Sequence, residues 1–446
     1  MKRIIQFFQF LFLTLQIYSV YGQLQPIYSK FKPLADLWGV TESEVPKLLA
    51  AEDNLVKGDN LLTPLLNEKD FGGSYINVKA NKIYINIINI SKKNEIIENP
   101  KMKDYKDLLE FKQASRSLED LNDTFSKLIN IADQYNAADF ILSNEYEFNN
   151  IVLYCYNKCQ KNNDFINYAK NFGVIIYLEN GDLFPSSDSK FKYRHNKTKR
   201  NSPNQDKRNL EIQLLGGDGI HNKEEEGIKP MTCSAGFWVS NGSQIFLASA
   251  GHCTLYGPYV KPPDDMSVDF LYLPWNSNNS VFYIGRMSIY SIIGSDKGYI
   301  LKENDDRFNS VPAIRNSDDP DYPELPIVGD LPLSTRGAYL CKSGHTTHVT
   351  CGILHSFRAI QRVPGVPGNP TISTINDVWA ARLISQKGDS GGPVFKFVIG
   401  EAGVRIVGMI VGAIKTKNNI SVSIFHPTDV ILRRDNSSLM DLITVP

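Results

Sequence analysis

The sequence of 446 residues lacks an excess of charge of either sign, because 48 Lys and Arg residues balance 48 Asp and Glu residues. It also lacks any segment after the first 22 residues that is apolar enough to cross a bilayer. These absences argue against nucleic acid and a membrane surface as partners. Hydrophobic residues make up 42% of the chain, as in a globular protein, and its length allows two or three domains.

The amino terminus carries an apolar run at residues 4–20, preceded by the basic residues Lys2 and Arg3. A short basic end, an apolar stretch and small residues at its close predict a signal peptide over residues 1–22, cleaved after Gly22. A membrane anchor is the alternative, but three glutamines interrupt the run. We therefore expect a secreted, extracellular protein.

Cysteine is scarce, with six residues in the whole chain. In an oxidising compartment these residues are expected to pair. Their spacing favours three local disulfides, Cys155–Cys159, Cys233–Cys253 and Cys341–Cys351. Glycosylation is also expected, because sequons occur at Asn89, Asn122, Asn196, Asn241, Asn278, Asn419 and Asn436.

Residues 23–180 show the pattern of a mixed α/β unit. The capping box at 41–44 predicts a helix that continues to Leu55, and "SLED" at 117–120 opens another. Residues 82–90 and 173–179 have the composition of strands. No cluster of side chains in this half indicates catalysis.

Residues 181–213 are polar, basic and almost free of apolar side chains. Such a segment cannot bury a core, so an exposed, protease-sensitive linker is predicted. It is either a plain tether or a processing region, with Arg200 and Arg208 as candidate cleavage sites.

From Leu214 onward, short β-rich runs alternate with Gly, Pro, Asn and Asp, which predicts an antiparallel sandwich or barrel. Ser390 lies within "GDSGGP", and a serine becomes a nucleophile only with a base and a group that orients this base. His252 in "LASAGHC" and Asp296 in "IGSDKGYI" are the candidates. The backbone amides of Gly388 and Ser390 are candidate donors to an oxyanion.

These motifs carry a resemblance. "ASAGHC" and "GDSGGP" resemble the chymotrypsin-type serine peptidases. Residues 214–220 ("LLGGDGI") and 341–352 ("CKSGHTTHVTCG") are similar to the streptogrisin and α-lytic protease branch. Residues 71–87 resemble the pro-region of that branch, so the resemblance touches both halves of the chain.

The resemblance implies an all-β catalytic domain of two six-stranded Greek-key barrels, about 214–330 and 331–446, with the active site between them. It implies that an α/β propeptide over residues 23–180, followed by the linker, assists folding and inhibits until it is cleaved, with the mature terminus near Leu214. Protein or peptide substrates and the chain's own propeptide are the expected partners. A monomer without cofactor or metal is expected.

The resemblance also implies the role of each residue. His252 is the general base and then the general acid, Asp296 orients it, and Ser390 forms the acyl-enzyme. Lys342 stands where the branch often has an arginine that pairs with Asp389, and a lysine loses the bidentate grip.

Two departures concern the specificity pocket, which is expected to include Ile384, Ser385, Val411, Gly412 and Ala413. Ile384 replaces a cysteine, so a bracing disulfide is missing, and its lack of charge disfavours Lys or Arg substrates relative to apolar or aromatic ones. Val411 replaces a serine that supports the catalytic aspartate, which weakens the orientation of Asp296 unless the alignment is shifted by a residue.

Three other interpretations compete with the peptidase. "GDSGG" also fits the nucleophile elbow of α/β-hydrolases, but that fold needs a helix after the serine, and His426 precedes Asp429 in the wrong order. The histidines of "HTTH" at 345–348 are expected on an exposed hairpin rather than on zinc. A catalytically impaired, peptidase-like binding protein remains the alternative of a different class.

Overall fold

The computed structural model describes residues 29–156, 159–178, 212–223, 230–255, 267–275, 277, 282–303, 308–365, 372–433 and 439–445. The expected signal peptide, the candidate cleavage sites Arg200 and Arg208, and the Cys159 side chain lie outside these residues, so their predictions stay untested. Within the described part of the chain, no helix is both long and apolar enough to cross a membrane.

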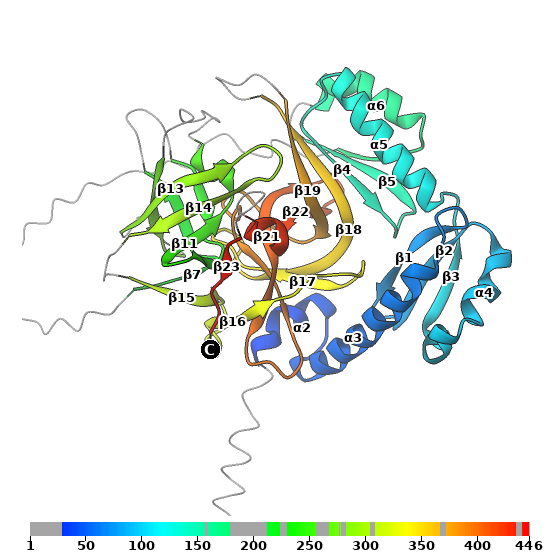
Figure 1. The fold of residues 1–446 in the computed structure, drawn as a ribbon, viewed down its shortest axis with the longest axis horizontal. Coiled ribbons are helices and arrows are strands. Elements are labelled where there is room, and N and C mark those ends of the chain that lie inside the picture. The colour runs from blue at the N-terminus through cyan, green and yellow to red at the C-terminus, as the bar shows by residue number, and fades with distance from the viewer. Residues whose placement is uncertain are drawn as a thin grey trace, which may run out of the picture.

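The amino-terminal unit, residues 29–178, is a mixed α/β structure (Figure 1). Its helices are α2 (Lys32–Trp38), α3 (Val45–Leu62), α4 (Lys93–Ile97), α5 (Leu118–Gln134) and α6 (Asn163–Lys170). Its strands are β1 (Phe71–Asn77), β2 (Lys82–Ile87), β3 (Leu109–Gln113), β4 (Phe140–Glu145), β5 (Asn150–Cys155) and β6 (Ile175–Leu178).

The local signals for these elements are confirmed. Thr41 and Glu44 form the expected capping box, and α3 then runs beyond the expected end at Leu55 to Leu62. The Ser117 side chain accepts a hydrogen bond from the Asp120 amide and so caps α5. The expected strands coincide with β2 and β6.

The carboxy-terminal unit, residues 212–445, consists mainly of strands. They are β7 (Ile212–Gly216), β8 (Gly219–Asn222), β9 (Thr232–Ser234), β10 (Trp238–Asn241), β11 (Gln244–Ser249), β12 (Val268–Leu273), β13 (Tyr283–Ser291), β14 (Lys297–Lys302), β15 (Phe308–Arg315), β16 (Glu324–Asp330), β17 (Tyr339–Lys342), β18 (Thr350–Val363), β19 (Ser373–Arg382), β20 (Pro393–Phe397), β21 (Val404–Lys415), β22 (Ser421–Pro427) and β23 (Asp441–Leu442). A 3₁₀ turn, η7 (Gly251–Thr254), follows β11, and helix α7 (Thr428–Leu432) follows β22.

Strand pairing in this unit describes two rings with the same connectivity. In the second ring, β17 pairs with β18, β18 with β19, β19 with β22, β22 with β21, β21 with β20, and β20 with β17, all antiparallel. In the first ring, β8 pairs with β9, β10 with β11, β11 with β14, β14 with β13, β13 with β12, and β12 with β8. No pairing joins β9 to β10 among the described residues, and the chain itself links them through residues 235–237, so the two count here as one interrupted strand of the first ring. Both follow the strand order 1-2-3-6-5-4, so the expected all-β fold is confirmed.

The two units share one sheet. Strand β4 pairs antiparallel with β18, so that Phe140 lies opposite Arg362 and Ser143 opposite Ala359. In Figure 1 the strands β5 and β4 continue the curved sheet of β18 and β19. The amino-terminal unit is therefore hydrogen-bonded to the second ring rather than only tethered to it.

A buried carboxylate adds a second contact between the units. Glu52 on α3 is 3% exposed. Its Oε1 accepts a hydrogen bond of 2.7 Å from the Tyr339 amide, and its Oε2 accepts one of 3.0 Å from Lys396 Nζ. Burial raises the pKa of Glu52, although the charge of Lys396 opposes the shift.

Residues 440–445 return to the first ring and fasten three segments. In β23, Leu442 lies opposite Val239 of β10. The Met440 amide donates to the Leu432 carbonyl at 2.7 Å, and the Val445 amide donates to the Ile327 carbonyl at 2.9 Å. Residues 440–445 thus form hydrogen bonds with β10, β16 and α7.

Candidate active site

His252 and Asp296 lie in contact between β11 and β14 of the first ring. His252 is on η7, directly after β11, and Asp296 directly precedes β14, which pairs with β11. The Asp296 carboxylate is fully buried. Its Oδ2 lies 2.5 Å from His252 Nδ1, and its Oδ1 accepts a hydrogen bond of 2.8 Å from the His252 amide. The carboxylate is therefore hydrogen-bonded to both the ring and the backbone of His252.

This contact sets the protonation of His252. Burial disfavours the imidazolium, but the charge of Asp296 and its hydrogen bond outweigh burial, so the pKa of His252 is raised above its ordinary value. A hydrogen bond from Nδ1 to a carboxylate leaves Nε2 as the atom that can accept a proton. The pair is thus arranged as a base with an orienting group.

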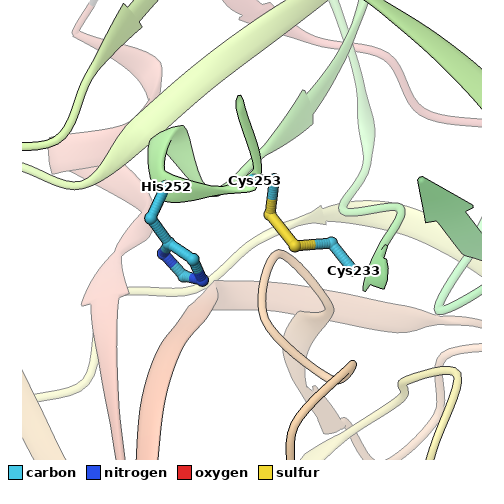
Figure 2. A group of neighbouring side chains, drawn as sticks. All are labelled: Cys233, His252 and Cys253. Carbon is cyan, nitrogen blue, oxygen red and sulfur yellow. A yellow bond between two sulfur atoms is a disulfide. The ribbon is translucent and has the colours of Figure 1, made fainter. Parts of the chain in front are cut away.

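A disulfide fixes the residue next to the histidine (Figure 2). Cys253 is bonded to Cys233, as expected, and the ligand atoms of these two cysteines and His252 lie within 4.8 Å of one another. Both sulfurs are in the disulfide, so they are not available as thiolate ligands. The Cys341–Cys351 disulfide is also confirmed, and Cys155 is disulfide-bonded too.

The turn that carries Ser390 packs against the segment that leads to His252. The Ser390 carbonyl accepts a hydrogen bond of 2.7 Å from the Ser234 amide. Gly391 has a φ of +87°, and a Cβ on it would lie 2.2 Å from Ser249 Oγ and 3.1 Å from the Ala250 nitrogen. Only a glycine at position 391 allows the two backbone segments to lie this close together. Ser390, which precedes it, therefore lies against the segment of the first ring that leads to His252.

The peptide groups around Ser390 are oriented by two hydroxyl groups. Thr346 Oγ1 donates to the Lys387 carbonyl, and Ser234 Oγ donates to the Gly388 carbonyl, both at 2.7 Å. A trans peptide points its carbonyl and its N–H in opposite directions. The Gly388 amide therefore points away from Thr346. Neither this amide nor that of Ser390 donates to another group within the described part of the chain. Unsatisfied amides beside a nucleophile can bind an oxyanion.

Asp389 has a different environment from Asp296. Its Oδ1 accepts hydrogen bonds from the Thr346 and Thr347 amides at 2.9 and 3.0 Å, and its Oδ2 accepts one of 2.6 Å from Thr347 Oγ1 and one of 2.8 Å from the Gln386 amide. Lys342 Nζ lies 3.5 Å from Oδ2, with both side chains fully buried. Burial lowers the pKa of Lys342 to about 8, against the effect of Asp389. The expected pairing of Lys342 with Asp389 is present.

The expected pocket residues have mixed surroundings. Ile384 is 52% exposed. Ser385 Oγ lies 2.8 Å from Ser423 Oγ, a residue that the sequence did not single out. Gly412 and Ala413 are half-buried.

Val411 lies among buried apolar side chains. Its side chain is 3% exposed and belongs to a buried apolar cluster with Val378 and Ile424, so it is a core residue. The hydrogen-bond partner that the second ring gives to Asp296 is His426, whose Nε2 lies 2.8 Å from the Asp296 amide nitrogen. No motif marks His426 in the sequence. Its contact depends on the pairing of β22 with β19 and β21.

The competing interpretations fare differently. The chain leaves Ser390 as strand β20 rather than as a helix, which contradicts the α/β-hydrolase elbow. The "HTTH" segment is the turn between the paired strands β17 and β18, as expected. It is more than an exposed hairpin, however, because Thr346 and Thr347 bind Asp389.

A cavity of about 250 Å³ lies elsewhere, where the two units meet. Trp38 and Tyr75 of the amino-terminal unit line it together with Arg336, His355 and Arg382 of the carboxy-terminal unit. It is not formed by the residues around Ser390.

No family model matches the chain, and no curated protein matches it. Among solved structures, Thermobifida fusca protease A is 20% identical over 52% of this chain and 100% of its own, with a TM-score of 0.38. Cellulomonas bogoriensis chymotrypsin and Nocardiopsis protease are each 19% identical over the same shares, with TM-scores of 0.36 and 0.35. Two of these structures are named as proteases and one as a chymotrypsin. The fold described above rests on the strand pairing of this chain itself.

Proposed function

We propose that this chain is a secreted serine endopeptidase that hydrolyses peptide bonds through an acyl-enzyme on Ser390. The observation that carries the proposal is the pair of His252 and Asp296 beside a turn that offers Ser390 and two unsatisfied amides. A base, its orienting carboxylate, a nucleophile and oxyanion donors are the groups that acyl transfer requires.

In the proposed reaction, His252 Nε2 takes the proton of Ser390 Oγ as this oxygen attacks the substrate carbonyl carbon. The Gly388 and Ser390 amides bind the oxygen that becomes negative. The carbon–nitrogen bond then breaks, and the amine leaves with the proton that His252 held. Water enters by the same route, cleaves the ester and restores Ser390. Asp296 stabilises the imidazolium throughout and keeps its own charge.

We further propose that the amino-terminal unit is the propeptide of a zymogen and that it helps the second ring to fold. This is supported by the pairing of β4 with β18 and by the buried contact of Glu52 with Lys396, which together offer a template for a strand of the ring. Cleavage within residues 181–213 would separate the units. An apolar or aromatic side chain is the proposed preference of the pocket, because Ile384 brings no charge to it.

Labelling by a fluorophosphonate probe tests the proposal on the processed, secreted protein. We expect a stable adduct on Ser390, found by mass spectrometry, and no adduct in Ser390→Ala. A serine without a base does not react, so Ser385, whose Oγ lies against Ser423 Oγ rather than a histidine, serves as an internal control. Failure of the folded wild-type protein to react would instead support the catalytically impaired binding protein.

A further inference from the structure

His426 is a buried histidine that the proposed reaction does not use. It lies on β22, is 0% exposed, and sits between the loop that carries Asp296 and the strand β19. Its Nε2 lies 2.8 Å from the Asp296 amide nitrogen, and its Nδ1 lies 3.0 Å from the Asp377 carbonyl oxygen. Both ring nitrogens therefore have a partner.

These two partners fix the proton on the ring. The Asp296 amide can only donate, so Nε2 must accept and carries no proton. The Asp377 carbonyl can only accept, so Nδ1 must carry the proton and donate it. The ring is thus a neutral imidazole with one permitted tautomer. Burial favours this neutral form, because it lowers the pKa of His426.

The loop that His426 meets crosses from the first ring to the second. The Gly294 amide donates to the Thr374 carbonyl at 3.0 Å, and the Asn376 amide donates to the Gly294 carbonyl at 2.7 Å. Asp377 itself has a left-handed φ of +52°, a conformation that few non-glycine residues adopt. The loop before Asp296 therefore docks on β19, and His426 bonds to the last peptide group of this loop.

The Asp296 side chain has little support of its own. Among the described residues, its two oxygens accept hydrogen bonds only from the amide and the ring of His252. Val411 offers no donor, because it is an apolar core residue. The position of the carboxylate must then follow from the position of its backbone.

We propose that His426 is a positioning residue, which holds the Asp296 backbone through its Nε2 so that the carboxylate meets His252. This inference rests on the proposed function for its effect on rate, but the geometry that it claims can be measured without activity. In this proposal, His426 of the second ring aligns Asp296 with His252, although both of these residues belong to the first ring.

Two substitutions separate the two hydrogen bonds of the ring. In His426→Gln, the terminal oxygen can reach the position of Nε2 and accept from Asp296, but the donor to Asp377 is lost. In His426→Asn, the terminal amide can reach the position of Nδ1 and donate to Asp377, but the acceptor for Asp296 is lost. Both side chains are neutral, polar and smaller than histidine, so each is the control for the other.

The readouts are the rate of fluorophosphonate labelling, kcat and KM separately, and the pKa of His252 from NMR of protein labelled with ¹³C at the histidine Cε1 atoms. For His426→Asn we expect kcat to fall about tenfold or more, as when a buried donor loses its acceptor, with KM little changed. The pKa of His252 should fall, because Asp296 no longer holds it up. His426→Gln should stay close to wild type in both.

Equal losses in the two variants, or a greater loss in His426→Gln, would overturn the proposal. A wild-type protein that does not react with the probe overturns the peptidase function alone, and the pKa of His252 in the two variants still decides the positioning role. If both variants fail to fold, ¹⁵N NMR of the wild-type histidines decides it, since a proton on Nε2 of His426 is incompatible with the proposal.

Discussion

Two buried aspartates flank the proposed reaction, and their partners differ. Asp389 accepts four hydrogen bonds from the backbone and a hydroxyl group, and Lys342 lies beside it. Asp296 accepts two, both from His252. A carboxylate that is saturated by fixed donors keeps a turn in shape. A carboxylate whose main partner is a single titratable ring can stabilise that ring when it becomes protonated. The partners thus suit Asp389 to a structural role and Asp296 to a catalytic one.

The largest expected effect comes from Asp296→Asn. An amide in this place favours the wrong tautomer of His252, and kcat should fall about 10⁴-fold, with little change in the free energy of unfolding. Steady-state kinetics and thermal unfolding measure the two quantities. Asp389→Asn is the matched control: it should lower stability as well as activity. If kcat of Asp296→Asn stayed within tenfold of the wild-type value, the catalytic role assigned to Asp296 would be contradicted.

Removal of the cation beside Asp389 should mainly affect stability. Lys342→Met leaves a buried carboxylate without its counter-charge, which typically costs about 3–5 kcal/mol in the free energy of unfolding. Urea denaturation measures the loss. The double variant Lys342→Met with Asp389→Asn should recover part of it, because no unpaired charge is left. No recovery would mean that Lys342 stabilises the turn through its other contacts, such as its hydrogen bond to the His348 carbonyl, rather than through the charge of Asp389.

The smallest effect is a shift along the pH axis. Since Asp296 raises the pKa of His252 and the general base must be neutral, the labelling rate should fall on acidification with a midpoint above the ordinary histidine value of about 6.5. In Asp296→Asn the residual rate should have a lower midpoint, because burial then acts without the opposing charge. Identical midpoints would show that Asp296 does not set the pKa of His252.

The sequence was informative wherever the chemistry is local. "GDSGGP" and "ASAGHC" predicted Ser390 and His252 as reactive residues, and the order of the chain predicted Asp296, which the structure places against His252. The two disulfides and the helix caps were also local patterns. Lys342 could be paired with Asp389 only through the resemblance.

What was missed depends on strands far apart in the chain. His426 meets Asp296 across 130 residues, through the pairing of β22 with its neighbours. Thr346 reaches the Lys387 carbonyl across 41 residues. The surroundings of Val411 could not be predicted either, because a shift by one residue along a strand moves a side chain to the opposite face, and no periodicity in β21 revealed which face is buried. The pairing of β4 with β18 has no sequence signal either, because it consists of hydrogen bonds between backbone groups, which every residue type except proline can form.

The fastening of residues 440–445 has a consequence for how the protein yields to force. Because β23 bonds to β10 of the first ring, while the preceding α7 follows β22 of the second, a pull at the carboxy terminus loads the junction of the two rings before either ring opens. A pull at this end therefore acts on both rings at once, whereas a pull at the amino-terminal unit acts first on the pairing of β4 with β18 of the second ring.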